Sequence, residues 1–180
     1  MCVLASAGCL DSPNDGDDAP VQLLANPDFE QGVAGWFFDG SVEVETTEVL
    51  GLPASAAGGH AALLGRGDNQ TDLVRQDVIV PDSAHRLELS GVRCYSTDEG
   101  TQDVYDTLVV SLTTIDGEPL EVLAESSNLD ATASTCEWLP FTITTDDHAG
   151  EALRLLIEAV TDDAVRTSFA IDGLALTARP

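Results

Sequence analysis

The chain contains no lysine, and its seven basic residues are all arginine, against 32 acidic residues. Without lysine, the sequence excludes Schiff-base chemistry on a lysine amine and a phosphate-binding P-loop. A formal net charge of −25 argues against nucleic acid as a partner, because binding phosphates requires a basic surface. The acidity indicates either a solvated surface suited to salty surroundings or carboxylates that bind cations.

Patterns for common catalytic and zinc sites are also missing. The histidines at 60, 85 and 148 are scattered singly, and there is no Cys-x-x-Cys, so a structural zinc site is not expected. No Gly-x-Ser-x-Gly is present to indicate a nucleophilic triad. A carboxylate pair for glycoside hydrolysis stays open, because 32 acids offer many pairs. No apolar run is long enough to span a membrane.

What is present is a strand pattern. Hydrophobic residues make up 43% of 180 residues, which suits one globular domain. Apolar and polar residues alternate in short runs between turn residues, as strands with one buried face do. Asp116-Gly117 marks a hairpin between strands near 107–115 and 119–124. The clearest alternating runs are 42–45, 108–113, 139–144 and 153–158.

One run changes the face on which its apolar residues lie. Leu87 and Leu89 share one face of a strand, whereas Val92 and Cys94 share the other. A β-bulge at Gly91 would return all four side chains to the core side. We therefore predict a bulge at this glycine.

The last run changes parity in the same way. Phe169 and Ile171 give way to Leu174 and Leu176 across Asp172-Gly173. A second bulge there would keep the apolar residues inward and re-aim the side chain of Asp172. About ten strands of this spacing predict an all-β protein, a two-sheet antiparallel β-sandwich.

The folded part opens on residues 26–36, Asn-Pro-Asp-Phe-Glu-Gln-Gly-Val-Ala-Gly-Trp, and closes on 168–176, Ser-Phe-Ala-Ile-Asp-Gly-Leu-Ala-Leu. The Asn-x-x-Phe-Glu-x-Gly…Gly-Trp opening resembles the first strand and turn of galactose-binding-like jelly rolls. These include carbohydrate-binding modules found as accessory domains of xylanases and cellulases. The resemblance covers roughly residues 21–177, and it implies that the sandwich is a jelly roll.

The resemblance also implies a structural calcium ion beside the first and last strands. Its ligands would be Glu30, backbone oxygens near Gly59, and Asp172. Calcium takes six to eight oxygen ligands, so further carbonyls and water must complete its shell.

Sugar binding in such modules depends on aromatic rings, which are only 5% of this chain. Tyr95 and Tyr105 flank the polar loop 96–104 and are the best candidates for ligand contact. Trp138, at the head of a strand, is the third. Packing is the alternative role for each ring, and a sugar binder needs at least two of them exposed on one concave face.

The N-terminus points to export. Residues 1–9 look like the tail of a bacterial lipoprotein signal, which makes Cys9 the predicted lipidation site. Residues 10–20 are short, acidic and rich in turn residues, as a linker is. The predicted organisation is signal remnant, linker and a domain over 21–178. We expect an exported lipoprotein at the outer membrane or cell surface, which touches the membrane only through its lipid.

Two further cysteines, Cys94 and Cys136, lie inside the domain, each at the end of a strand run. In an exported protein we predict that they form a disulfide.

These observations predict a non-catalytic, surface-tethered module of the carbohydrate-binding type, stabilised by calcium, with a polysaccharide or other glycan as partner. The alternative is a structural or adhesive cell-envelope domain that binds a protein. A carboxylate-based glycoside hydrolase is the third possibility.

Overall fold

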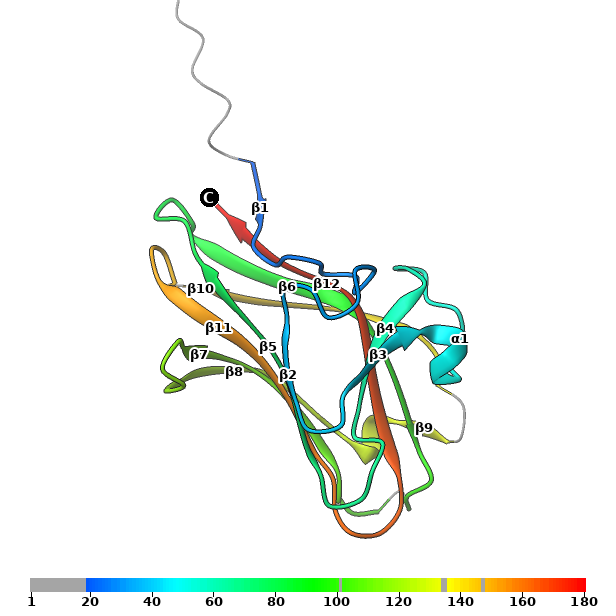
Figure 1. The fold of residues 1–180 in the computed structure, drawn as a ribbon. Helices are drawn as coiled ribbons and strands as arrows, with labels where there is room; N and C mark the ends of the chain where they lie inside the picture. Colours follow the sequence, from blue (N-terminus) through cyan, green and yellow to red (C-terminus); the bar gives the residue numbers. More distant parts are fainter. Residues whose placement is uncertain (1–18, 101, 134–135, 147) are drawn as a thin grey trace, which may run out of the picture.

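The computed structural model describes residues 19–100, 102–133, 136–146 and 148–180. The predicted lipidation site Cys9 and nearly all of the predicted linker lie outside the described residues. Two β-sheets pack face to face, as predicted (Figure 1). Helical structure in the described residues is confined to a short α-helix, α1 (Thr47–Leu50), and a 3-10 turn, η1 (Asn128–Asp130).

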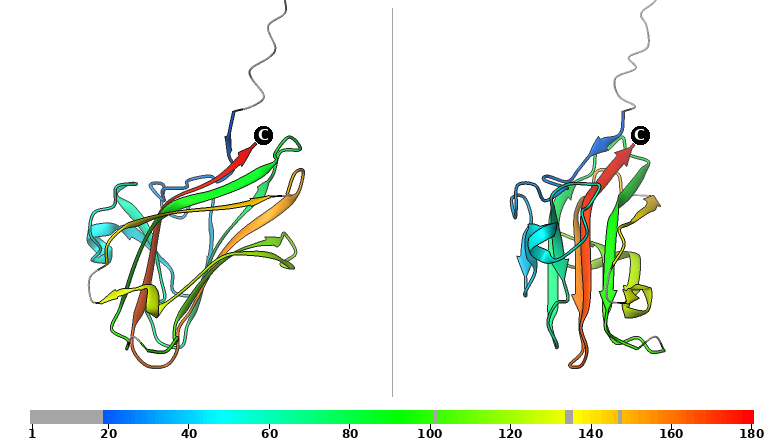
Figure 2. Two further views of the ribbon diagram at one scale, coloured as in Figure 1. Left: turned by 180° about the vertical axis from the view of Figure 1, so that it is seen from behind. Right: turned by 90° about the vertical axis from the view of Figure 1, so that its right-hand side faces the viewer.

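The first sheet has seven strands, and its last strand in the chain, β12, runs between β6 and β4 (Figure 2). Its main order is β10 (Leu139–Asp146), β6 (Arg86–Thr97), β12 (Thr167–Arg179), β4 (His60–Leu64) and β3 (Glu43–Thr46). Two short strands add to it: β1 (Val21–Gln22) pairs with β12, and β9 (Thr132–Ala133) pairs with β6.

The second sheet has five antiparallel strands. Their order is β2 (Phe37–Asp39), β5 (Thr71–Ile79), β11 (Ala152–Val160), β7 (Thr107–Thr114) and β8 (Pro119–Ser127). β7 and β8 form the predicted hairpin, with Gly117 in its turn at φ 93°. The period-two pattern is confirmed in β7 and β11, whose inward residues are Leu108, Val110, Leu112, Leu153, Leu155 and Ile157.

The bulge predicted at Gly173 is confirmed. The pairing of β12 with β6 shifts register between Asp172 and Ala175, so Ile171 and Leu174 both face the core. Asp172 points to the other side of the sheet, where the segment containing Ser55 covers it.

The bulge predicted at Gly91 is wrong. β6 pairs with β10 in unbroken register from Arg86 to Arg93, and strict alternation therefore places Arg93 and Tyr95 between the sheets. Cys94 lies on the outer side and is nevertheless buried. Apolar residues appear on both faces of β6 because both faces are covered, which is why the change of parity did not require a bulge.

The cover on the outer side is a second, smaller core. The predicted disulfide between Cys94 and Cys136 is confirmed, with 5.2 Å between the two Cα atoms. It lies among apolar side chains from α1, β4 and β12, with Trp138 packed against them. The members of this second core are Leu50, Ala61, Leu63, Cys94 and Ala170.

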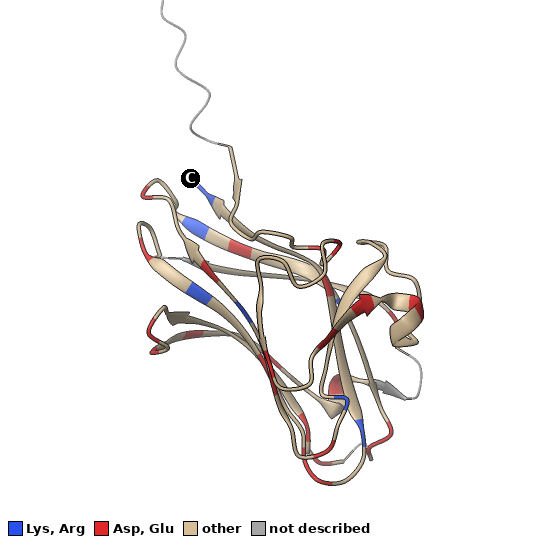
Figure 3. Ribbon diagram, viewed as in Figure 1, with Lys and Arg blue, Asp and Glu red and all other residues tan. Residues whose placement is uncertain are grey.

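Acidic residues are spread over the loops and strands of both sheets (Figure 3). Most of the arginines lie near a second arginine: Arg179 pairs with Arg86 across β12 and β6, Arg66 and Arg166 line one hollow, and Arg75 and Arg154 line another. No helix in the described residues has the length and apolar content needed to cross a membrane.

Candidate functional site

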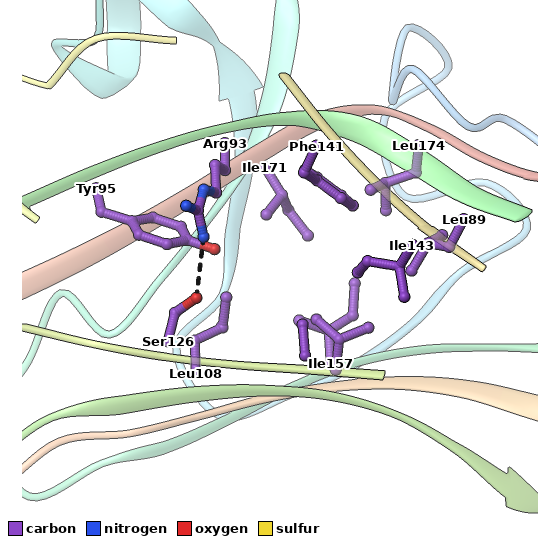
Figure 4. Close-up of a pocket in the computed structure, with 12 residues that line it drawn as sticks. Leu89, Arg93, Tyr95, Leu108, Ser126, Phe141, Ile143, Ile157, Ile171 and Leu174 are labelled. Atoms are coloured by element: carbon purple, nitrogen blue, oxygen red, sulfur yellow. Dashed lines mark hydrogen bonds between the residues drawn. The ribbon is translucent and has the colours of Figure 1, made fainter. Parts of the chain in front are cut away.

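The structure separates the three predicted ligand-binding rings. Tyr95 is 8% exposed and lies inside the sandwich, where its ring meets Phe169 edge to face at a centroid distance of 5.1 Å. Figure 4 shows its hydroxyl pointing toward the gap between the sheets, beside Arg93 and Ser126. A ring in this position packs in the core, and only a ligand that enters the sandwich can touch it.

Trp138 and Tyr105 lie elsewhere. The Trp138 indole N–H donates to the carbonyl oxygen of Pro53 at 2.8 Å, and the ring covers the second core on the outer side of the seven-stranded sheet. Tyr105 is 44% exposed in the loop before β7, where its hydroxyl donates to Asp103 at 3.3 Å. The nearby charge of Asp103 raises the pKa of the Tyr105 phenol. The three rings therefore do not form one binding face.

The predicted calcium ligand Glu30 is held by backbone donors. Its Oε1 accepts hydrogen bonds from the amides of Gly59 at 2.5 Å and His60 at 2.8 Å, and its Oε2 lies 3.2 Å from His60 Nδ1. The backbone and side-chain hydrogen bonds from His60 lower the pKa of Glu30. Gly58 leaves the space that this carboxylate occupies, because a Cβ at that position would collide with Glu30 Oε1. Buried Phe29, directly before it, fixes its place through a ring contact with Trp36 at 5.3 Å.

Asp172 is fully buried beneath residues 55–60, the segment that also holds Glu30. It accepts hydrogen bonds from the Ser55 hydroxyl and, at 2.6 Å, from the amide of Gly173. Burial raises the pKa of Asp172, and the charges of Glu30 and Asp28 raise it further. The opening segment and the last strand thus bring Glu30 and Asp28 close enough to Asp172 for their charges to repel. Within the described ranges, no three side chains of His, Cys, Asp or Glu converge to hold a metal.

A different group of side chains lies together on the outer face of the five-stranded sheet. Phe37 on β2 pairs with Arg75 on β5, and Asp77 on β5 pairs with Arg154 on β11. The guanidinium carbon of Arg75 lies 4.0 Å from the centroid of the Phe37 ring, and Phe37 remains 49% exposed. We call Phe37, Arg75, Asp77 and Arg154 the outer-face cluster.

The outer-face cluster borders an open hollow of about 530 Å³. The loop before β2 closes one side with Gly35 and Trp36. Gln76 of β5 holds the start of this segment: its side chain donates to the carbonyl oxygen of Ala25 at 3.1 Å and accepts from the Ala25 amide at 2.6 Å. The loop is therefore tied to β5, and the hollow has a fixed wall.

Two of the charged side chains in this cluster, Asp77 and Arg154, form an ion pair. Hydrogen bonds from Arg154 lower the pKa of the Asp77 carboxyl, and Asp77 in turn raises the pKa of Arg154. The carboxylate therefore stays charged at all pH values near neutrality, and the hollow offers both acceptors and donors of hydrogen bonds.

Sequence reasoning missed the outer-face cluster. One signal was available: Arg75 and Asp77 are two residues apart and so share a face of their strand. In the doublet Phe37-Phe38, alternation likewise sends one ring outward. The sequence could not show that β11 places Arg154 opposite Asp77, because pairing register is a property of the assembled sheet.

Comparison of the sequence with known protein families finds no match. Comparison with curated proteins finds none either.

Solved structures do share the fold. TmCBM61, solved in complex with β-1,4-galactotriose, has a TM-score of 0.63 at 15% identity, covering 88% of this chain and 99% of that one. The K3 cleaved adhesin domain of Lys-gingipain from Porphyromonas gingivalis has a TM-score of 0.56 at 14% identity, with 88% and 99% covered. Arabinose-bound MgGH51 α-L-arabinofuranosidase has a TM-score of 0.55 at 12% identity, covering 86% of this chain but 26% of the enzyme.

Other carbohydrate-binding modules are also among the similar structures. Identities this low establish the architecture and not the ligand. The chain therefore shares its two-sheet β-sandwich fold with these carbohydrate-binding modules, with the adhesin domain and with part of the arabinofuranosidase.

Proposed function

We propose that this chain is a non-catalytic carbohydrate-binding module that holds a glycan in the hollow beside the outer-face cluster. The observation that carries the proposal is the half-exposed ring of Phe37 next to two guanidinium groups and a carboxylate. Sugar rings stack their apolar faces on aromatic side chains, while their hydroxyls need donors and acceptors at fixed positions.

Each member of the cluster has a part in this arrangement. Arg75 lies over Phe37 and holds the ring in place. The Asp77 carboxylate accepts hydrogen bonds from sugar hydroxyls, and the two guanidinium groups donate to them. At about 530 Å³, the hollow has the size of an ordinary small-ligand site.

A depletion assay tests the proposal. The protein is mixed with insoluble β-1,4-galactan, xylan, arabinan, cellulose and chitin, and the fraction left in solution is measured. Retention on at least one polymer, competed away by its soluble oligosaccharide, supports the proposal. Failure to be retained by any member of a broad glycan panel would contradict it.

The alternative is an adhesive domain that binds a protein. It is favoured by exposed aliphatic side chains on the same outer face: Ile79 is 77% exposed, Val122 54% and Val160 38%. Apolar side chains on an open face suit a protein surface better than a sugar. Under this alternative, no polymer in the panel retains the protein.

For calcium, the carboxylates of Glu30 and Asp172 supply the oxygen ligands that this ion prefers. Their mutual repulsion, which contributes to the raised pKa of Asp172, would be relieved by a cation between them. Both already accept hydrogen bonds, so backbone carbonyl oxygens and water would form much of the shell. We propose that calcium stabilises the fold from this position, and the test is given with the predictions for Asp172.

We propose finally that Cys9 carries a lipid that tethers the domain to a membrane through the linker. Expressed behind a complete lipoprotein signal, the wild-type protein should then fractionate with membranes, and Cys9→Ser should become soluble. Wild-type protein recovered in the soluble fraction with an unmodified Cys9 would refute the tether.

A further inference from the structure

A cavity of about 150 Å³ lies between the two sheets and is separate from the outer-face cluster. Nine apolar and three polar side chains line it. Figure 4 shows the polar ones, Arg93, Tyr95 and Ser126, gathered at one end, while side chains such as Leu89 and Ile143 form the other. The cavity is thus amphiphilic along its length.

The cavity reaches the surface between two sheet edges. β10 and β8 are the edge strands on this side of the two sheets. Phe141 and Ile143 of β10 and Ala124 of β8 line the cavity and are each partly buried. Because these lining residues at the two edges are not fully buried, a ligand can enter without unfolding the core. Gly91 faces Phe141 and Leu174 across the interior, and a Cβ there would come within 3.0 Å of the Phe141 ring.

Arg93 is the arginine that lines this cavity. Arg66, Arg154 and Arg179 each have a carboxylate partner, whereas within the described residues Arg93, like Arg75, Arg86 and Arg166, forms no ion pair. Its Nη1 donates to the Ser126 hydroxyl at 3.1 Å, and its guanidinium carbon lies 5.2 Å from the centroid of the Tyr95 ring. A guanidinium has five N–H donors, of which the Ser126 and Tyr95 hydroxyls account for two.

Arg93 is partly exposed, and a guanidinium that loses part of its water to apolar neighbours is costly without an opposite charge. The chain has 32 acidic residues that could have supplied one. Instead, the direct partners of Arg93 at this end are two neutral side chains, Tyr95 and Ser126. Burial raises the pKa of Tyr95, and the charge of nearby Asp130 adds to this, but Asp130 forms no ion pair with Arg93 in the part of the chain that the structure describes. An anion from outside the protein would complete this site.

We propose that this cavity binds a small organic carboxylate with an apolar body. Its carboxylate pairs with Arg93, and its body lies against Leu89, Ile143 and Leu174. An apolar cavity of about 150 Å³ accepts a molecule of the size of benzene, so a benzoate-sized anion or a short fatty acid fits. This site is independent of the proposed glycan site.

Methyl-detected NMR with sodium benzoate and with toluene tests the proposal, at about 0.15 M salt so that long-range repulsion by the acidic surface is screened. Benzoate should shift the methyl signals of Ile143, Ile157 and Leu174, and it should bind at least tenfold more tightly than toluene because a charge-assisted pair is added. No shift of these methyls, or equal affinity for the two probes, would overturn the proposal.

Three variants locate the binding. Arg93→Gln keeps a donor for Ser126 but removes the charge, so benzoate affinity should fall at least tenfold while toluene affinity is kept. Ala124→Leu fills the cavity and should weaken both probes. Arg154→Gln, on the outer face, should change neither. Benzoate binding that is lost in Arg154→Gln, or kept in Ala124→Leu, would place the anion elsewhere and overturn the proposal. If circular dichroism shows that Arg93→Gln is unfolded, Ala124→Leu and Arg154→Gln decide the question.

Discussion

Asp77 on β5 and Arg154 on β11 stand opposite each other in the paired strands, joined by two parallel hydrogen bonds. Nε donates to Oδ1 at 2.7 Å and Nη2 donates to Oδ2 at 3.0 Å. This two-bond geometry fixes both planar groups on the outer face of the sheet. A ligand in the neighbouring hollow therefore meets polar groups that are already ordered, and it loses little entropy in ordering them.

Arg154→Gln should reduce glycan affinity about tenfold, because glutamine cannot hold the carboxylate with two bonds or donate as a cation. Stability should change by less than about 1 kcal/mol, since the Asp77 side chain is 52% exposed and ion pairs at the surface contribute little. Affinity is measured by isothermal titration with the retained oligosaccharide. The matched control is Arg66→Gln, which breaks the pair with Glu43 and should leave affinity unchanged. Equal losses in both variants would argue against the outer-face cluster as the site.

Phe37→Ala should weaken retention on the bound polysaccharide at least several-fold, because stacking on one aromatic ring contributes on the order of 1 kcal/mol or more and this ring is the exposed aromatic of the hollow. The melting temperature should stay nearly unchanged, as the residue is 49% exposed. Tyr105→Ala is the control, since Tyr105 is equally exposed but lies in the loop before β7. Loss of retention in Tyr105→Ala alone would move the site to that loop.

Tyr95→Ala should destabilise the fold by about 3 kcal/mol, because it removes a large buried ring from its contact with Phe169. Chemical denaturation monitored by tryptophan fluorescence measures the change. Tyr105→Ala should shift the midpoint little in the same experiment. A Tyr95→Ala protein as stable as the wild type would show that this ring is not part of the core.

Loss of the disulfide should destabilise the fold by up to about 4 kcal/mol, by the chain-entropy estimate for a cross-link over 42 residues. The double variant Cys94→Ala/Cys136→Ala should unfold at a lower denaturant concentration than the wild type. Intact-mass analysis of the wild type should find both thiols oxidised. Two free thiols at these positions would contradict the bridge in the protein as produced.

Asp172 should make stability fall as pH rises. Its ordinary pKa is about 4, and burial raises the pKa in the folded state. The folded state therefore binds the proton more tightly than the unfolded state. Well below pH 4 the carboxyl is neutral in both states, and stability falls as pH rises from the unfolded pKa to the raised folded pKa. In chelator, Asp172→Asn should thus gain unfolding free energy relative to wild type between pH 4 and pH 7.

The response to calcium is a second test of Asp172. An ion that binds only the folded state raises the melting temperature by mass action, so calcium should stabilise the wild type at pH 7 and have no effect on Asp172→Asn or Glu30→Gln. Asp116→Asn, in the exposed β7–β8 turn, is the control for both experiments. A wild-type melting curve that is indifferent to calcium and chelator would remove the ion from this site. A pH dependence identical in wild type and Asp172→Asn would contradict the raised pKa.

Local patterns were sufficient where a single strand carried the information. The alternation in β7 and β11, the hairpin at Gly117 and the bulge at Gly173 follow from the order of apolar residues and glycines along one segment. The cysteine pair could also be inferred, because two cysteines at strand ends have few other roles in a domain that is predicted to be exported.

The same reasoning failed at Gly91. It assumed that a strand has one buried face, whereas the outer side of β6 is covered by the second core around Cys94. The error has a functional consequence, because the unbroken register is what sends Arg93 into the sandwich. No local pattern reveals a cover that comes from α1, β4 and the segment around Trp138.

The sequence by itself determined the all-β class, the strand alternation and the acidic, lysine-free surface, because each depends on residues near one another in the chain or on composition alone. The tertiary structure decided which side chains meet. It separated Tyr95, Tyr105 and Trp138, and it assembled Phe37, Arg75, Asp77 and Arg154 from three strands. The physical reason is that register between strands is set by the packing of the whole sandwich, so a surface built across strands exists only once the sheets have formed.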